Sequence, residues 1–256
     1  MSYETLLLDR QGKVAVLTLN RPPQNAVSYA MLGEIEKAIE EVASDKDARV
    51  LVITGSGERS FSAGMDVGDA ISHPDVGEVG RALWTKIDRL EKPTIAAING
   101  HALGGGCELA LACHFRFMAS SERAKIGCPE LNLGIIPGWG GTQRLTRLLG
   151  RSKALELMLR SKRLSPDEAL AIGLVDGVYP PDQLMSQVME LANELSEKAP
   201  LAVRAVIRAV RAHLEKGIDA GLQVETDEVA IVTKSTDAVE GFTAFMEKRK
   251  PNFKGE

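Results

Sequence analysis

Two glutamates stand in sequence surroundings that make an acidic side chain costly. Glu108 lies near the start of a run of apolar residues at 109–113, and Glu130 follows Pro129 and precedes a second mostly apolar stretch at 131–137. Burying a carboxylate costs free energy unless it is paired or serves a function. Taken singly, either glutamate also fits a helix start or a turn. If both face one site, their pKa values can differ, so that one acts as a base and the other as an acid.

A glycine cluster immediately precedes the first glutamate. Residues 97–108 read Ala-Ile-Asn-Gly-His-Ala-Leu-Gly-Gly-Gly-Cys-Glu, which predicts a strand, a glycine turn and the start of a helix. Such a turn aims backbone N–H groups at an anion and lets a ligand approach the backbone closely. The dinucleotide-binding pattern fails because Leu109 stands where it requires Gly or Ala, and no phosphate-binding Gly-x4-Gly-Lys-Ser/Thr sequence occurs. A tight turn that serves only packing remains an alternative.

A second loop offers another N–H group. Residues 61–66, Phe-Ser-Ala-Gly-Met-Asp, come shortly after a predicted buried strand that ends at Thr54. Two backbone donors on one oxygen would stabilise negative charge that develops there.

The elements that must position these residues alternate in a strand–strand–helix rhythm in the first half of the chain. A hairpin is expected at residues 5–9 and 14–20, and Ser28 can cap a helix that runs to about residue 43. The remaining predictions are strands at 49–54, 94–99, 115–119 and 124–127, a loop at 55–64, and helices at 79–90 and from 104–106 to about 113.

The second half of the chain is predicted to be almost wholly helical. After a short segment at 174–179, no strand pattern recurs, and composition changes near residue 195. We therefore expect a mixed α/β core at residues 1–195 and a helical region at 196–256. The predicted helices cover residues 141–149, 152–160, 166–172, 181–198, 200–215, 219–233 and 236–248.

Five fragments, in order, resemble the crotonase (enoyl-CoA hydratase/isomerase) superfamily. They are residues 61–66, 97–108, 129–130, 133–145 (Leu-Gly-Ile-Ile-Pro-Gly-Trp-Gly-Gly-Thr-Gln-Arg-Leu) and 245–253 (Phe-Met-Glu-Lys-Arg-Lys-Pro-Asn-Phe). The resemblance covers nearly the whole chain. It implies an α/β fold in which a spiral of ββα units precedes a C-terminal helical region used in trimerisation, often as a dimer of trimers.

The resemblance also implies a site and a reaction. The N–H groups of Met65 and Gly105 would bind the thioester oxygen of an acyl-CoA. Both acidic positions match those of hydratases, whereas isomerases, thioester hydrolases and decarboxylases of the family generally keep one or neither. The expected reaction is reversible hydration of a trans-2-enoyl-CoA to a 3-hydroxyacyl-CoA, as in fatty-acid β-oxidation. Glu108 would deprotonate water that attacks Cβ, and Glu130 would protonate Cα.

Other reactions of this fold remain open, namely dienoyl-CoA hydration and enoyl-CoA isomerisation, as does a noncatalytic CoA- or RNA-binding role. The first predicted helix opposes RNA binding, because it carries four glutamates at positions 34, 36, 40 and 41 against the single Lys37. Glu108 and Glu130 also stand one or two residues further apart than in typical relatives, which we attribute to a surface turn at 120–123.

The family's coenzyme A contacts transfer to six positions. Coenzyme A is expected as part of the substrate, so no permanently bound cofactor is predicted. Lys248 also fits a solvated lysine at a helix end. The six residues are Asn25, Ala26, Ala63, Gly64, Asp66 and Lys248.

The bulk composition excludes several classes of protein. Among 256 residues, 31 basic and 35 acidic side chains give a net charge of −4, which argues against nonspecific nucleic-acid binding. The most apolar stretch, residues 94–118, is interrupted by charged and glycine residues and is expected in the core, and we see no signal peptide. Three cysteines without a Cys-x-x-Cys motif and four scattered histidines predict buried thiols and no metal site in a cytoplasmic protein. Trp84 and Trp139 are expected to pack in the core, and Trp139 is also a candidate wall of the acyl pocket.

Overall fold

The computed structural model describes residues 3–256. It contains two β-sheets, and successive turns of the chain contribute strands to both. The larger sheet has the strand order β1-β2-β3-β5-β7-β9, and the smaller has β4-β6-β8. Among the named strands of the described residues, β1 and β2 pair antiparallel and all other neighbours pair parallel. The strands are β1 (Leu6–Gln11), β2 (Val14–Leu19), β3 (Val50–Gly55), β4 (Ser60–Ser62), β5 (Thr94–Ile98), β6 (His101–Leu103), β7 (Phe115–Ala119), β8 (Ile126–Gly127) and β9 (Gly177–Tyr179).

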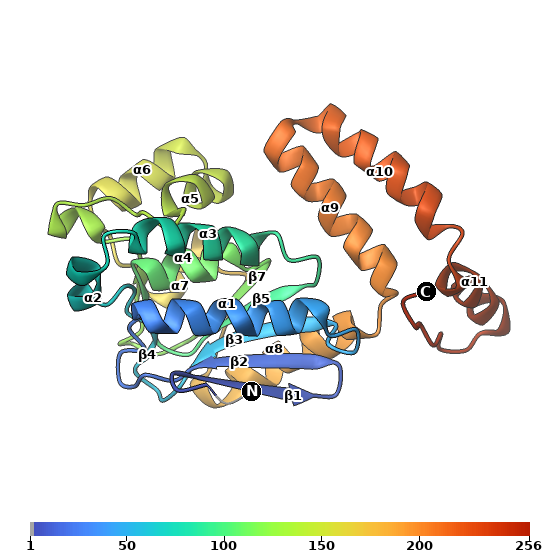
Figure 1. The fold of residues 1–256 in the computed structure, drawn as a ribbon, viewed down its shortest axis with the longest axis horizontal. Coiled ribbons are helices and arrows are strands. Elements are labelled where there is room, and N and C mark those ends of the chain that lie inside the picture. The colour runs from blue at the N-terminus through green and yellow to red at the C-terminus, as the bar shows by residue number, and fades with distance from the viewer. Residues whose placement is uncertain (1–2) are drawn as a thin grey trace.

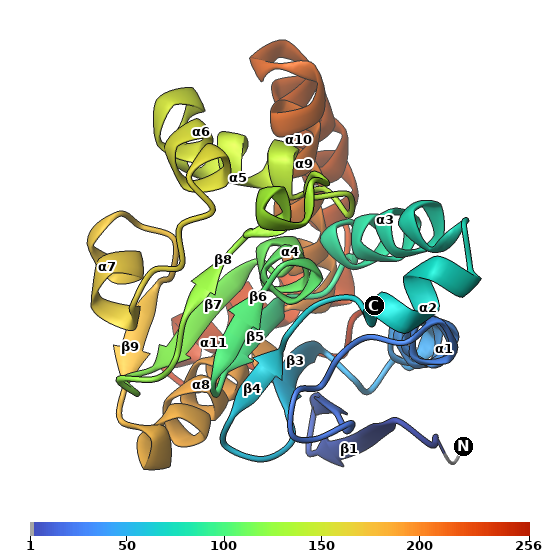
Figure 2. The same cartoon turned by 90° about the vertical axis from the view of Figure 1, so that its left-hand side faces the viewer.

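Three successive turns of the chain each add one strand to each sheet. The chain passes from β3 to β4, from β5 to β6 and from β7 to β8, and helical structure follows each pair. Figure 2 shows the strands of the smaller sheet beside those of the larger one. The predicted spiral of ββα units is therefore confirmed.

Helices cover both faces of the larger sheet. Alternate side chains of its strands point to opposite faces, and the apolar side chains on each face pack against helices. Leu17, Leu51 and Ile53 pack in the main core, to which α1 (Tyr29–Ser44), α3 (Val76–Asp88) and α4 (Gly105–Ala112) contribute. Val16 and Val52 instead pack with α8 (Pro181–Ser196) in a second cluster. The helix α1 begins as predicted, because the Ser28 hydroxyl accepts a hydrogen bond from the Met31 N–H.

The sequence did not reveal three short elements. Strand β4 lies inside the predicted loop at 55–64, β6 lies between the predicted strand at 94–99 and the glycine turn at 104–106, and α2 (Val67–Ser72) has no helical pattern. Strands of three residues are too short to show a period, and their pairing defines them. The helix expected at 79–90 also begins earlier, at Val76.

The helices of the second half match their predicted positions within a few residues. In Figure 1, α9, α10 and α11 stand apart from the body that the sheets form. The composition change near residue 195 falls at the end of α8, and the division into two domains there stays a prediction. The helices are α5 (Gly141–Leu149), α6 (Arg151–Leu159), α7 (Pro166–Ala171), α8, α9 (Pro200–Lys216), α10 (Ile218–Val232) and α11 (Thr236–Glu247), and a 3-10 helix, η1, spans Glu130–Leu133.

Within the described part of the chain, no helix has the length and apolarity that a membrane span requires.

Candidate active site

Three segments meet where the strands of the smaller sheet end. Because β4, β6 and β8 are parallel, their carboxyl ends lie at one edge, and the residues that follow them come together. Gly64 packs directly on the turn after β6: a Cβ atom at Gly64 would lie 2.8 Å from the Leu103 oxygen and 2.9 Å from the Gly105 nitrogen. The φ of Gly64 is also +91°, which side chains disfavour. Glycine at this position therefore sets Met65 close to Gly105.

The N–H groups of Met65 and Gly105 are both free to bind a ligand. Val27 donates to the Gly64 oxygen and accepts from the Asp66 N–H, so the Met65 N–H points away from Val27. Gly105 opens α4, where an N–H has no partner within the helix. Among residues 3–256, neither group donates a hydrogen bond. The structure thus brings the two predicted donors together.

The conformation of Gly104 sets the direction of the second donor. Its φ of 55° and ψ of −127° are accessible mainly to glycine, and its N–H donates to the Gly127 oxygen at 3.0 Å. Because ψ of Gly104 rotates the following peptide plane, this conformation determines where the Gly105 N–H points.

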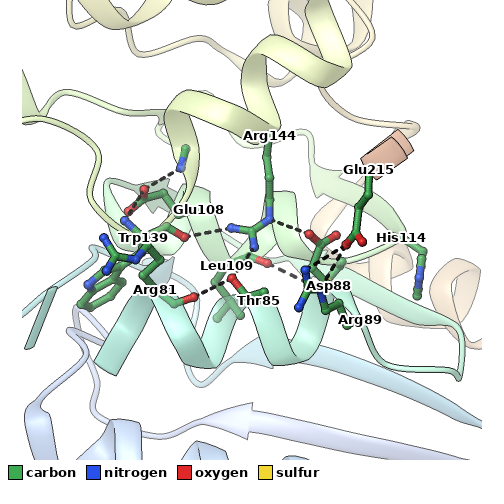
Figure 3. Close-up of polar contacts among 12 residues, drawn as sticks. Arg81, Thr85, Asp88, Arg89, Glu108, Leu109, His114, Trp139, Arg144 and Glu215 are labelled. Carbon is green, nitrogen blue, oxygen red and sulfur yellow. Dashed lines mark hydrogen bonds and ion pairs between the residues drawn. The ribbon is translucent and has the colours of Figure 1, made fainter. Parts of the chain in front are cut away.

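Glu108 is held by one of its two carboxylate oxygens. The side chain is 2% exposed, and Oε1 accepts hydrogen bonds from the N–H groups of Trp139 at 2.8 Å and Gly141 at 2.7 Å (Figure 3). Burial raises the pKa of Glu108, while the two N–H donors and the charge of Arg144 act to lower it. Oε2 takes part in no hydrogen bond within the described residues, which leaves it available to a water molecule.

Glu130 has the opposite surroundings. It opens η1 and is 9% exposed, and its Oε2 is buried without a partner among residues 3–256. Burial, with the nearby charge of Glu108, raises the pKa of Glu130 to about 7. A Cβ atom at Gly104 would lie 3.4 Å from Glu130 Oε1, so this carboxyl group lies against the turn that presents the Gly105 N–H. The structure therefore brings both predicted glutamates to the two donors.

Two tryptophans support the donor at Gly105. The indole of Trp139 packs where side chains at Gly80 and Gly105 would otherwise be, and it meets Trp84 edge to face with centroids 5.3 Å apart. Trp84 Nε1 donates to the Gly105 oxygen at 3.0 Å. The predicted packing role of both residues is confirmed. Sequence reasoning missed the hydrogen bond from the Trp139 N–H to Glu108. The glycines on both sides of Trp139 are the feature that could have indicated an exposed backbone N–H there.

The expected coenzyme A residues divide into two groups. Asn25, Ala26 and residues 63–66 lie alongside one another, because Ala63 donates to the Gln24 oxygen and Val27 bridges to Met65. The buried Asn25 side chain is already engaged, since it donates to the oxygens of Ser56 and Ser60.

Asp66 and Lys248 differ from the simple expectation. The Asp66 carboxylate pairs with Arg21 at 3.2 Å and caps α2 through the Gly68 N–H, so it serves the loop itself. Lys248 follows α11, which lies at the far end of the molecule's longest dimension from α2 (Figure 1). A single copy of the chain therefore does not bring Lys248 to the site.

The expectations for cysteine agree with the structure. Cys107, Cys113 and Cys128 are buried and unbridged. No cluster of three or more His, Cys, Asp or Glu side chains suited to a metal ion occurs within residues 3–256.

The chain is similar in sequence and in structure to known proteins over nearly its whole length. The family model described as enoyl-CoA hydratase/isomerase matches residues 9–256. Crotonyl-CoA hydratase of Syntrophomonas wolfei is 43% identical, covering 99% of each protein, and short-chain-enoyl-CoA hydratase of Clostridium acetobutylicum is 40% identical, covering 98% of this chain and 97% of that protein. The crystal structure of enoyl-CoA hydratase from Bacillus anthracis superposes with a TM-score of 0.95 at 38% identity, covering 99% of this chain and 100% of that one.

Proposed function

The chain belongs to the enoyl-CoA hydratase/isomerase family, and we propose that it catalyses reversible syn addition of water to the 2,3-double bond of a trans-2-enoyl-CoA, giving a 3-hydroxyacyl-CoA. One observation carries the proposal: two buried carboxyl groups of unlike surroundings lie beside two backbone N–H groups that have no acceptor within residues 3–256.

The thioester oxygen binds between the N–H groups of Met65 and Gly105. As water attacks Cβ, the π electrons move toward this oxygen, and the two donors stabilise the enolate charge. Loss of one such donor typically costs about 3–4 kcal/mol of transition-state stabilisation.

The surroundings of the two glutamates support a division of the proton transfers. Two N–H donors on Oε1 favour the ionised form of Glu108, so its Oε2 can take a proton from water as the oxygen bonds to Cβ. With its pKa raised to about 7, Glu130 carries a proton in a substantial fraction of molecules near neutral pH, and that proton goes to Cα. Water supplies the hydroxyl at Cβ, and the proton left on Glu108 returns to solvent or to Glu130 before the next cycle.

Hydration fits the site better than the other reactions of the family. An isomerase moves one proton between two carbons and needs a single acid–base group, whereas hydration must deprotonate water and protonate Cα. Two carboxyl groups at one site favour hydration. The acidic surface of α1, where Glu36 and Glu40 pair with Lys86, gives no support to an RNA-binding role.

The names of the relatives guide the choice of acyl group. Two relatives at 40% identity or more are named for crotonyl-CoA and for short-chain enoyl-CoA. We therefore propose short-chain 2-enoyl-CoA thioesters as substrates, in fatty-acid β-oxidation. Buried thiols without a disulfide support a cytoplasmic location.

We also propose that the working enzyme is a homo-oligomer, a trimer or a dimer of trimers. Helix α9 has no buried residue, and apolar side chains on α9, α10 and α11 are exposed, among them Val206, Val229 and Phe245. Apolar surface on this scale is typical of subunit interfaces. Assembly would also give Lys248 a route to the site of another copy.

Substitution of each glutamate tests the function. Glu108→Gln and Glu130→Gln should each reduce hydration of crotonyl-CoA by about 100-fold or more, because each removes one proton transfer. The loss of the enoyl-thioester absorbance band reports the rate, and a titration with a nonhydrated CoA ester should show nearly unchanged binding. The exposed Glu122→Gln is the matched control and should hydrate at the wild-type rate. Near-wild-type turnover by either active-site variant would refute its assignment.

A further inference from the structure

A buried arginine stands directly behind the turn that holds Glu108. Arg144 lies on α5, is 8% exposed, and makes three side-chain contacts (Figure 3). Its Nη1 donates to the Trp139 oxygen at 2.8 Å, its Nε donates to Asp88 Oδ2 at 3.2 Å, and its Nη2 donates to Thr85 Oγ1 at 3.4 Å. Burial of a guanidinium group costs free energy unless such partners are in place.

The turn at 139–141 is gripped from two sides. On one side the N–H groups of Trp139 and Gly141 donate to Glu108 Oε1, and on the other the Trp139 oxygen accepts from Arg144. Gly140 has a φ of +107°, and the Arg144 guanidinium fills the space that a side chain there would need. Arg144 therefore contacts the turn through both a hydrogen bond and close packing.

Helix α3 is the fixed body to which the turn is attached. Four of its residues, spaced four apart and so on one helical face, meet the site. The Val76 oxygen accepts a hydrogen bond from Trp139 Nε1, and Gly80 faces the same indole. One turn further along, Trp84 Nε1 donates to the Gly105 oxygen. The last of the four, Asp88, forms an ion pair with Arg144. Asp88 and Thr85 hold Nε and Nη2 of the guanidinium group. The orientation of Nη1, which donates to the Trp139 oxygen, is therefore fixed.

The charges around Glu108 come from several elements. Arg144 on α5 acts to lower the pKa of Glu108, and the carboxyl group of Glu130 on η1 faces it. The Cys128 thiol, just before η1, lies near both glutamates, and a hydrogen bond with Cys107, together with burial, keeps its pKa well above the usual range. Asp88 stands beyond Arg144 and partly balances its charge.

We propose that Arg144 is a positioning residue for hydration: by tying the 139–141 turn to α3, it fixes Glu108 with one oxygen on two N–H groups and the other turned toward water. The proposal rests on the proposed function, because it requires Glu108 to act on the water. Arg144 contacts neither Glu108 Oε2 nor the two oxyanion donors, so its role is exerted through the turn.

The first test compares three substitutions by steady-state hydration of crotonyl-CoA at several pH values. Arg144→Gln should lower kcat about 10- to 100-fold, the range that follows from a small misplacement of a catalytic group, while KM changes less than about threefold. Asp88→Asn removes the ion pair at the outer end and should lower kcat to a lesser extent. Arg151→Gln, the same change at an exposed position at the start of α6, is the control and should leave kcat and KM unchanged.

The pH profile separates a positioning role from mere stability. Hydration needs ionised Glu108, so kcat/KM falls at low pH as Glu108 gains a proton. Loss of the Arg144 charge removes an effect that lowers the pKa of Glu108, so Arg144→Gln should move this acidic limb to higher pH. Arg144→Lys keeps the charge without the planar fork, and should leave the limb in place while kcat stays below wild type. Asp88→Asn should not move the limb upward.

Circular dichroism and thermal melting, run on each variant, establish that it is folded at the assay temperature. If Arg144→Gln does not fold, Arg144→Lys and Asp88→Asn carry the test. The proposal would be overturned by a folded Arg144→Gln enzyme with wild-type kcat and an unshifted acidic limb, or by a folded Arg144→Lys enzyme with wild-type kcat. If Glu108→Gln is inactive in the same assay, the proposed function still stands. If the wild-type enzyme itself does not hydrate crotonyl-CoA or longer enoyl-CoA esters, the function fails, and this role of Arg144 fails with it.

Discussion

At the scale of single residues, the two glutamates have the same chemistry and differ only in their surroundings. Two N–H donors on Glu108 Oε1 favour a carboxylate, whereas Glu130 Oε2 is buried without a donor from the described residues and favours a carboxylic acid. The proposed division into base and acid thus follows from the placement of backbone N–H groups. A site that keeps one carboxyl group unsatisfied gives up stability for chemistry.

This cost predicts a pH-dependent gain in stability for Glu130→Gln. The pKa of Glu130 is about 7 in the folded protein against 4.5 for an ordinary glutamate, so the folded state binds more protons between these values. Stability contributed by this group is therefore lost as pH rises from 4.5 to 7. At pH 8, Glu130→Gln should exceed the wild type in free energy of unfolding by about 1–2 kcal/mol, with allowance for partial contact with solvent.

Denaturant unfolding at pH 8 and at about pH 4.5 measures this effect. The difference between Glu130→Gln and wild type should shrink toward zero at the lower pH, because both then carry a neutral group. Glu122→Gln, at an exposed position, should show no such trend. A Glu130→Gln variant that is less stable than wild type at pH 8 would contradict an unsatisfied buried carboxyl group.

At the scale of elements, the site depends on how closely two turns approach. The loop after β4 and the turn after β6 touch at Gly64, where a Cβ atom would overlap the Leu103 oxygen. Gly64→Ala should therefore separate Met65 from Gly105 and lower kcat/KM for crotonyl-CoA about 100-fold.

A second glycine provides the matched control for this prediction. Gly57 also has a positive φ, of 73°, but a Cβ atom there would meet nothing within 4 Å. Gly57→Ala should cost about 1 kcal/mol of stability from backbone strain and keep its activity. Equal activity losses in the two variants would show that strain alone, and not the approach of the two turns, explains the effect at Gly64.

The sequence predicted the elements that carry their own pattern. Helix α1, with its Ser28 cap and apolar stripe, and α5, at 141–149, were found in place because their signals are local. Strands β4 and β6 were missed because three residues show no period. The glutamates were found through their apolar surroundings, whereas the Arg144–Asp88 pair joins helices far apart in sequence, a contact that no local pattern reveals.

At the scale of the whole molecule, the last three helices are incomplete as a folded surface. Helix α9 packs against α10, and three of its apolar residues, Val206, Val210 and Leu214, stay exposed, with Val206 at 63%. A groove of about 480 Å³ between α9 and the body is lined by Val206, Val210 and Leu214 together with His114 and Phe115. Such a surface is stable in water when a second copy of the chain covers it.

A charge placed on this surface should therefore prevent assembly. Val206→Glu should shift the protein from an oligomer to a smaller species in size-exclusion chromatography with light scattering, because burial of an unpaired carboxylate opposes association. Leu7→Glu, at an exposed apolar position on the edge strand β1, is the control and should keep the wild-type mass. A Val206→Glu protein with the wild-type mass would contradict an interface through α9.

Assembly should also affect substrate binding more than the chemical step. Lys248 lies far from the site of its own chain, so any contact it makes with coenzyme A must come from a neighbouring copy. Lys248→Ala in the intact oligomer should then raise KM for crotonyl-CoA several-fold and leave kcat almost unchanged, because a contact to a remote phosphate binds ground state and transition state alike.

Dissociated Val206→Glu protein should show at least the same rise in KM, and adding Lys248→Ala to it should cause no further rise. A further rise in the double variant would place Lys248 on the site of its own subunit, and an unchanged KM in Lys248→Ala would exclude it from coenzyme A binding.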